Sequence, residues 1–241
     1  CYRRAGSTMN PLGPLELTGR SRAHVIELAE LSCCAQPDAA AALLRMRAAA
    51  ARDGLDLTPA SGYRDFARQR AIWNAKYRGE RKLLDRDGRP VEHAALAPQE
   101  LIGTILLWSS LPGASRHHWG TDFDLIDMVA VRVRRAVQPD WQPQLLPEEF
   151  APGAVFGPLA AWLDRNAARF GFFRPYRIDA GGVLPEPWHL SYAPLAVPAL
   201  ERFSIDDLRA ALLAEPVDGR DEILRRLPEL FERYVRGVSP P

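Results

Sequence analysis

The stretch Ser115–Asp124, SRHHWGTDFD, is the most informative part of this chain, because it combines histidine and aspartate in a pattern typical of metal ligands. It places His117 seven residues before Asp124, with a glycine between them. A second stretch, Glu186–His189 (EPWH), adds another histidine with a glutamate three positions before it. Two imidazoles and one carboxylate leave the fourth position of a zinc ion open for water, whereas structural zinc sites are usually closed by four Cys or His ligands. The composition of the two stretches therefore points to a hydrolytic metal site.

With a third stretch, Ser61–Arg64 (SGYR), these motifs resemble those of the VanY-type zinc D-alanyl-D-alanine carboxypeptidases. The hallmarks of that family read roughly Ser-Gly-Tyr-Arg, then Ser-x-His-x-x-Gly-x-Ala-x-Asp, then Glu-Pro-Trp-His. All three occur here in that order, and the resemblance covers about residues 40 to 195. Three ordered motifs are far more specific than any one of them alone.

The resemblance implies a metal centre and a base. The zinc ligands would be His117, Asp124 and His189, and Glu186 would be the general base. The neighbouring His118 does not have the family spacing to the aspartate, so it is expected to be a second-shell or solvent-exposed imidazole. On a regular strand, residues 186 and 189 would face opposite sides. The proline between them permits a local bend, but spacing alone does not establish the two roles.

The resemblance also implies contacts to the substrate. Arg64 would stabilise the oxyanion, and together with Gln69 and Ser115 it would hold the C-terminal residue of the substrate. A guanidinium suits both tasks because it offers planar, bidentate donors. Trp188 and Tyr192 would either stack on the substrate or pack around the site.

These roles imply hydrolysis of the C-terminal D-amino-acid peptide bond of peptidoglycan stem peptides. Zinc would lower the pKa of a water molecule toward about 7. Glu186 would take its proton and pass it to the leaving amine. An L,D-carboxypeptidase or a D-Ala-D-Ala dipeptidase would use the same metal centre, and a non-catalytic zinc-bearing cell-wall-binding module is the alternative from another class. The glutamate argues against that module, which has no need of a general base.

One position departs from the family pattern. Asp122 stands where the pattern has alanine, two residues before Asp124. In a strand these positions face the same side. The side chain is therefore expected either to join the metal shell or to pair with Arg116, Arg174 or another cation away from it.

Composition limits the other functions. A length of 241 residues suits one domain or one domain with an appendage. The net charge of +1 gives no long-range field for nucleic acid or an anionic membrane. No apolar run approaches the roughly 20 residues of a membrane-spanning helix. We expect an extended lead-in over residues 1–22, a zinc peptidase domain over 23–200 and a C-terminal helical extension over 201–241.

The local patterns predict an α+β fold, in which a small antiparallel sheet carries the zinc site and helices pack beside it. The predicted helices span about 38–51, capped by Asp38, then 66–77, capped by Asp65, then 98–109, 156–170 and 220–235, with a capping box at Ser204–Asp207. The predicted strands span 55–60, 121–126, half-buried, and 183–192. Residues 79–96 and 138–153 are predicted to be loops beside the cleft.

The cysteines leave several alternatives open. The chain begins at Cys1, as a mature bacterial lipoprotein does, which would place it in the cell envelope on the periplasmic side of a membrane. An arbitrary start of the sequence is the alternative. The adjacent Cys33 and Cys34 could form a vicinal disulfide, stay reduced or pair between molecules. The oligomeric state is left open.

Overall fold

A small antiparallel sheet organises the fold. The computed structural model describes residues 11–241, so the prediction for Cys1 lies outside the described residues. Four strands form the sheet in the order β3-β6-β8-β7, and every neighbouring pair is antiparallel. Their bounds are β3 (Leu57–Ser61), β6 (Asp122–Asp127), β7 (Phe172–Phe173) and β8 (His189–Tyr192). Two short hairpins lie outside this sheet, β1 (Ile26–Leu28) with β2 (Cys33–Ala35) and β4 (Leu83–Leu84) with β5 (Pro90–Val91).

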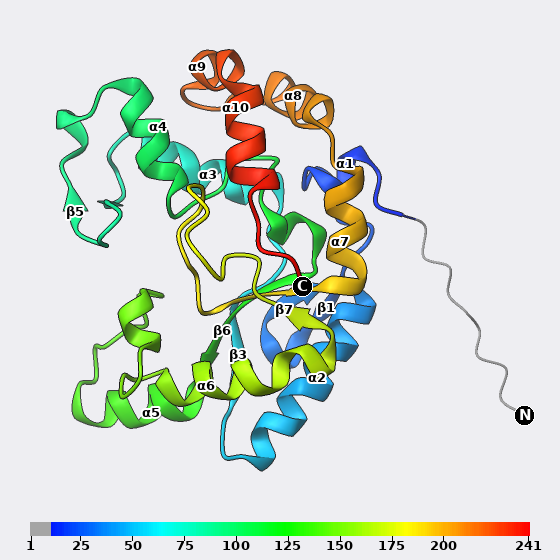
Figure 1. The fold of residues 1–241 in the computed structure, drawn as a ribbon, viewed down its shortest axis with the longest axis vertical. Coiled ribbons are helices and arrows are strands. Elements are labelled where there is room, and N and C mark those ends of the chain that lie inside the picture. The colour runs from blue at the N-terminus through cyan, green and yellow to red at the C-terminus, as the bar shows by residue number, and fades with distance from the viewer. Residues whose placement is uncertain (1–10) are drawn as a thin grey trace, which may run out of the picture.

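Helices surround the sheet and give the fold its α+β character (Figure 1). In chain order they are α1 (Pro14–Leu17), α2 (Pro37–Arg52), α3 (Phe66–Tyr77), α4 (Pro98–Leu106), α5 (Met128–Val137), α6 (Gly157–Asn166), α7 (Ala193–Arg202), α8 (Ile205–Ala214), α9 (Arg220–Arg225) and α10 (Leu227–Phe231). The predicted fold class is confirmed. Within residues 11–241, no helix has the length and apolar character needed to cross a bilayer.

The pairing of β6 with its two neighbours brings the three sequence motifs together. Asp124 lies opposite Ser61 on β3 and opposite His189 on β8. A bulge between Pro59 and Ser61 interrupts the first pairing, and bulges of this kind re-aim side chains next to many active sites. The sheet tolerates Pro59 because β3 is an edge strand.

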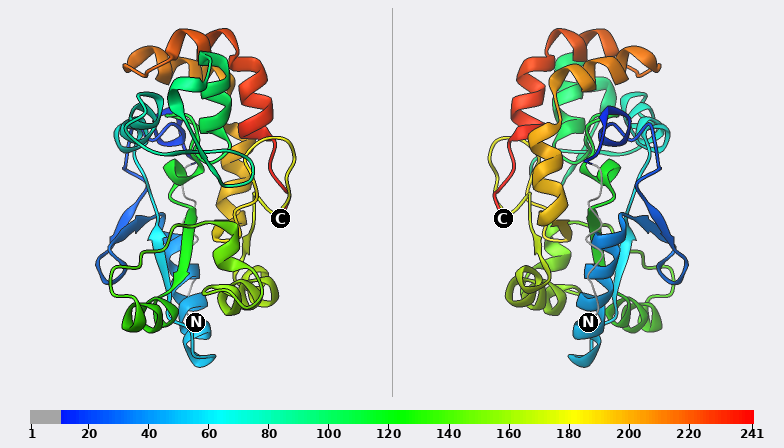
Figure 2. Two further views of the ribbon diagram at one scale, coloured as in Figure 1. Left: turned by 90° about the vertical axis from the view of Figure 1, so that its left-hand side faces the viewer. Right: turned by 90° about the vertical axis from the view of Figure 1, so that its right-hand side faces the viewer.

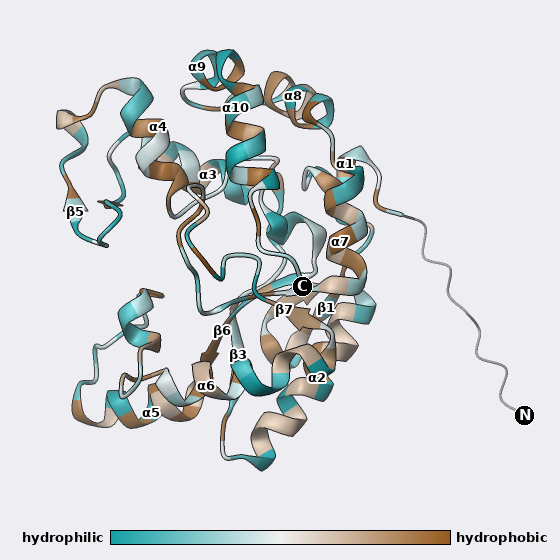
Figure 3. Cartoon of the chain, viewed as in Figure 1, coloured by the Kyte–Doolittle hydropathy of each residue, from teal (hydrophilic) through white to brown (hydrophobic). Residues whose placement is uncertain are grey.

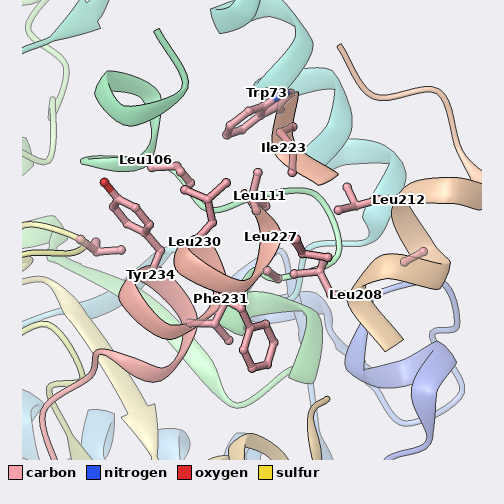
Figure 4. Packing of buried hydrophobic residues seen from close by; sticks show 14 of the residues in the cluster. Trp73, Leu106, Leu111, Leu208, Leu212, Ile223, Leu227, Leu230, Phe231 and Tyr234 are labelled. Atoms are coloured by element: carbon pink, nitrogen blue, oxygen red, sulfur yellow. The ribbon is translucent and has the colours of Figure 1, made fainter. Parts of the chain in front are cut away.

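Two hydrophobic clusters stabilise the chain. The first joins α3 and α4 to the C-terminal helices, with Trp73, Leu106 and Leu230 fully buried among its members (Figure 4). The second packs α2 and α6 onto the sheet around Leu43 and Phe123, which are also fully buried. Figure 2 shows α8, α9 and α10 gathered over α4 at one end of the molecule, and α2, α5 and α6 at the other end. In Figure 3, hydrophobic and hydrophilic residues share each outer helix, as expected when one face packs inward.

Two differences from the predicted strands bear on the site. The last strand is shorter than predicted, because β8 begins only at His189. Glu186 precedes it in a turn, closed where the backbone N–H of His189 donates to the Glu186 carbonyl at 3.1 Å. The strand β6 was predicted to be half-buried, but all six of its residues are buried. Its Phe123 and Leu125 pack in the second cluster, while the opposite face carries Asp122 and Asp124.

Other local predictions were partly right. The predicted caps at Asp65 and Ser204 are confirmed. The helix α2 is capped by Gln36 and not by Asp38, because the helix already begins at Pro37.

Two terminal segments differ from their predicted form. The helix predicted to run to about residue 235 is divided into α9, α10 and a π-helical turn, Glu232–Arg236. The proline near the start of α10 lacks the N–H that would continue the α9 hydrogen bonding. Part of the segment predicted to be extended forms α1, and its Leu17 is buried.

The two cysteines of β2 are free thiols in the structure, and both are half-buried. Burial raises the pKa of the Cys33 thiol to about 11. The backbone carbonyl of Cys34 accepts a hydrogen bond from the Tyr63 N–H at 2.9 Å, which ties β2 to the loop after β3.

Candidate metal and catalytic site

His117, Asp124 and His189 converge on one point beside the sheet and form a group that could hold a metal ion. Nε2 of His117 lies 3.3 Å from Oδ2 of Asp124, and Nδ1 of His189 lies 3.1 Å from Oδ1 of the same carboxylate. All three side chains are buried. Ligands about 2.0–2.2 Å from a tetrahedral zinc lie roughly 3.3 Å from one another. The spacing of these atoms therefore suits such an ion.

Local backbone geometry presents the first histidine. His117 lies on a 3₁₀ turn, Arg116–Trp119, which ends at Gly120 with φ 67°. Glycine adopts this left-handed conformation without steric cost. A Cβ at this position would also lie only 2.9 Å from the backbone nitrogen of Gln36. The glycine thus lets the chain turn directly from the histidine into β6, which carries Asp124.

Each histidine is oriented through its second ring nitrogen. Nδ1 of His117 lies 2.9 Å from the carbonyl oxygen of Gly62, so its Nε2 is left for a metal. Nε2 of His189 lies 3.0 Å from Oδ1 of Asp122, so its Nδ1 faces Asp124. Metal-binding histidines usually donate the other N–H to a carbonyl or carboxylate, which fixes the tautomer and the ring orientation. The two rings have the arrangement that this rule requires.

The charge around His189 favours a bound cation. Carboxylate oxygens of Asp122, Asp124 and Glu186 lie within 3.2 Å of its ring nitrogens. Burial would lower the pKa of His189, but the three carboxylates outweigh it and hold that pKa well above its usual range. Oδ1 of Asp124 is buried and, despite its proximity to the ring, makes no well-formed hydrogen bond. A metal ion would satisfy this oxygen and balance the negative charge, so the donor set fits such an ion.

Asp122 contacts both a candidate metal ligand, His189, and one of the cations considered, Arg116, so its pairing with the cation is not away from the metal position. The side chain is fully buried, and the same Oδ1 accepts from Arg116 Nε at 2.9 Å and faces His189 Nε2. Burial would raise the pKa of Asp122, but Arg116 and His189 hold it below its ordinary value. Arg174, the other cation considered, pairs with Asp164 instead. Asp122 therefore links a buried arginine to the ring of a candidate ligand.

Glu186 lies beside the candidate metal position. Its Oε2 is 3.2 Å from Nδ1 of His189, and its side chain is 12% exposed. The turn that precedes β8 brings both side chains to one side, which an uninterrupted strand would not do. The backbone N–H of Glu186 donates to the Tyr176 carbonyl at 2.9 Å, and the Tyr176 ring lies 5.0 Å from the His189 ring. Nothing in the sequence motifs indicated this tyrosine.

Arg64 is held by uncharged oxygens. Its Nη1 donates to Oε1 of Gln69 at 2.7 Å, and its Nη2 donates to Oγ of Ser61 at 3.0 Å. Each Nη carries two hydrogens, so one on each remains for a ligand. Burial lowers the pKa of Arg64, against the opposing effect of Asp124 and Glu186. Gln69 is fully buried and donates to the Ser110 carbonyl, so it positions the arginine and does not line the pocket.

A pocket of about 240 Å³ opens onto this cluster. Of the residues expected to contact substrate, Arg64, Ser115 and Trp188 line it. Trp188 is also packed on Phe150, with ring centroids 5.4 Å apart. Tyr192 does not line the pocket, because its ring packs against Phe172 on β7. Of the two alternatives for Tyr192, its contact with Phe172 corresponds to packing around the site.

His118 has a structural place in the fold. It is fully buried, its Nδ1 lies 2.6 Å from the Arg64 carbonyl oxygen, and its Nε2 accepts from the Gly113 N–H at 3.1 Å. Burial lowers the pKa of His118 to about 3, so the ring is neutral. Of the two sequence-based alternatives, the solvent-exposed one is excluded, because the buried ring contacts the backbone of Arg64.

Lys76 is a pocket residue that the sequence motifs did not indicate. It lies in the last turn of α3, lines the pocket and donates from Nζ to Oγ of Ser109 at 2.8 Å. One signal could have found it. Lys76 follows Gln69 by seven residues, which is close to two helical turns, so both project from one face of α3.

A buried group of two histidines and one aspartate beside a glutamate, on an α+β fold, is typical of metal-dependent hydrolases. The family model described as VanY: D-alanyl-D-alanine carboxypeptidase matches residues 33–195, and the chain belongs to this family. The resemblance predicted from the three motifs is confirmed.

Two relatives and one solved structure are also similar to this chain. An uncharacterised protein of Haemophilus influenzae (strain Rd) is 35% identical over 132 residues, which are 52% of this chain and 92% of that protein. A second uncharacterised protein of the same organism is 39% identical over 103 residues, which are 42% of this chain and 70% of that protein. Among solved structures, VanYB in complex with D-alanine-D-alanine matches with a TM-score of 0.52 and 19% identity over 90% of this chain and 93% of that one. That last similarity shows the fold.

Proposed function

We propose that the protein is a zinc-dependent carboxypeptidase that removes the C-terminal D-amino acid from peptidoglycan stem peptides ending in D-Ala-D-Ala. The observation that carries this proposal is the convergence of His117, Asp124 and His189 with Glu186 on one pocket. Membership of the VanY family supports the reaction, and the D-alanine-D-alanine bound to VanYB supports the substrate class. A peptidoglycan substrate implies that the protein works in the bacterial cell envelope.

The proposed metal ligands are Nε2 of His117, a carboxylate oxygen of Asp124 and Nδ1 of His189. The two imidazoles are already turned toward one another by their bonds to Gly62 and Asp122. Bound zinc would polarise the scissile carbonyl and lower the pKa of water toward about 7. An arrangement fixed before binding costs little reorganisation when the metal enters.

Glu186 is the proposed general base. Its carboxylate is close enough to His189 to reach a water molecule placed against the scissile carbonyl. It would take a proton from that water and later donate it to the amine of the leaving residue.

Arg64 is proposed to contact the reacting end of the substrate. Its two remaining Nη hydrogens can donate to the developing oxyanion or to the terminal carboxylate. Ser61, Gln69 and the backbone brace of His118 hold the guanidinium and its main chain in place. Ser115 and Trp188 complete the pocket wall around the bound residue.

The test is the release of free D-alanine from a defined stem pentapeptide by zinc-loaded protein. The wild type should release it, chelation should abolish release, and added zinc should restore it. Glu186→Gln removes the base but keeps the side-chain volume, so it should retain zinc while losing at least about 100-fold in kcat. Loss of zinc in this variant would make Glu186 a ligand. Full activity would remove it from the mechanism.

A further inference from the structure

The pocket contains two cations that have no acidic partner. Arg64 donates to Gln69 and Ser61, and Lys76 donates to Ser109, all of them uncharged groups. Within residues 11–241, the ion pairs of the structure involve other basic side chains. By contrast, Arg116, which also lines the pocket, is paired with the carboxylate of Asp122.

An ammonium group in this position has an energetic cost. Burial lowers the pKa of Lys76 to about 8, the Glu186 carboxylate opposes that effect, and the positive charges of Arg81 and Arg64 add to it. A buried charge without a close counter-charge is unfavourable. A bound anion would offset both the desolvation of Lys76 and the repulsion between Lys76 and Arg64.

The presence of a lysine and not an arginine at position 76 also favours a bound ligand. The chain contains 31 basic residues, of which only Lys76 and Lys82 are lysines. An ammonium is a compact point charge with three donors, whereas a guanidinium is a broad planar fork. In a pocket of about 240 Å³ that already holds Arg64, the smaller cation leaves room for a ligand.

The substrate of the proposed function supplies a matching anion. A peptide hydrolysed at its last bond carries a free carboxylate on the leaving residue, and this group must enter the pocket together with the scissile bond. We propose that Lys76, held by Ser109, is a second cationic contact for that carboxylate beside Arg64, and thereby a determinant of specificity for free peptide C-termini. This inference rests on the proposed function.

The experiment combines a change in the protein with a change in the substrate. Zinc-loaded wild type, Lys76→Met and Lys76→Arg are each given the same stem peptide with a C-terminal carboxylate or a C-terminal amide. Methionine keeps the length and loses the charge, and arginine restores a charge. Lys82→Met is the matched control, because it removes the other lysine of the chain at an exposed position. Zinc content and thermal unfolding show whether each variant is folded and loaded.

Wild type and the control should both prefer the free carboxylate. Lys76→Met should lose about 10-fold or more in kcat/KM on the free acid, mainly through KM, because it loses a charge-assisted hydrogen bond to the carboxylate. Its loss on the amide should be much smaller, so the preference for the acid should shrink. Lys76→Arg should recover part of that preference.

Two results would overturn the inference. Lys76→Met could retain the full preference for the free acid, in which case the carboxylate is bound elsewhere. Alternatively, it could lose kcat equally on both peptides at unchanged KM, which would assign Lys76 to the environment of Glu186. If neither wild type nor Lys82→Met cleaves either peptide, the proposed function itself has failed, and the outcomes are therefore distinguishable.

Discussion

Asp122→Ala removes the buried carboxylate that joins Arg116 to His189. Arg116 is only 4% exposed, and its Nη1 already lacks a hydrogen-bond partner. Without Asp122 its guanidinium becomes a buried charge with no counter-charge. Removing one partner of a buried ion pair costs about 3–5 kcal/mol, which is a large share of a typical unfolding free energy of about 5–15 kcal/mol. We therefore expect a loss of stability of about 3–5 kcal/mol, although alanine is the residue of the common family pattern.

The double variant Arg116→Met/Asp122→Ala separates charge from packing. Replacing a buried ion pair by apolar side chains is often neutral, so the double variant should recover most of the stability lost by the single one. Urea unfolding of metal-free protein measures the unfolding free energy of each variant without a contribution from zinc. Zinc retention in a chelator competition should fall about 10–100-fold in both variants, because His189 has lost its Nε2 acceptor.

Three outcomes would contradict these roles of Asp122. If the unfolding free energy of Asp122→Ala is within about 1 kcal/mol of the wild-type value, Arg116 does not depend on Asp122 as its counter-charge. If the double variant is as unstable as the single one, packing and not charge decides the loss. Unchanged zinc retention would remove Asp122 from the orientation of His189.

Three further predictions follow from the site. His117→Ala should lose zinc, whereas His118→Ala should retain it but unfold more readily, since the Arg64 carbonyl loses its partner; equal zinc loss in both would show that the wrong histidine was chosen. Arg64→Ala should lower kcat/KM by about 10-fold or more on peptides with a free C-terminus, as measured by D-alanine release, because a charged donor is lost; unchanged kinetics would exclude it from the site. Lys76→Met should make the protein more stable at pH 7, because burial lowers the pKa of Lys76 from 10.5 to about 8. The cost of the buried ammonium to the unfolding free energy is at most about 3 kcal/mol. This cost is fully present below the folded pKa of about 8, and it disappears as pH rises toward the unfolded pKa of 10.5. The stability difference measured in urea should therefore shrink from pH 7 to pH 10, and a constant difference would contradict this.

The sequence predicted the fold class and the family because both depend on short-range patterns. Alternation and turn residues located β3 and β6, and three motifs in order specified the family. The proline at 187 indicated that a bend was possible, but the start of β8 at His189 was not predicted, since the residues from 183 onward were assigned to one strand. The turn at Pro187 matters because it brings Glu186 and His189 to one side.

Contacts between residues far apart in the sequence could not be predicted from short-range patterns. Strand periodicity placed Asp122 on the same side as Asp124, but it could not show that one carboxylate would serve both Arg116 and His189. The site of Lys76 depends on how α3 packs beside the loop containing Ser109, which has no local sequence signal.

The central claim is that this pocket releases one residue from the C-terminus of a stem peptide. The most direct test is mass spectrometry of the products formed from a defined pentapeptide and from the tetrapeptide that lacks its last D-alanine, with zinc-loaded protein and with Glu186→Gln. We expect the wild type to convert the pentapeptide into the tetrapeptide and free D-alanine, to leave the tetrapeptide unchanged, and to act far faster than Glu186→Gln. Release of the dipeptide D-Ala-D-Ala, cleavage of the tetrapeptide alone, or equal activity of the two proteins would contradict the assignment.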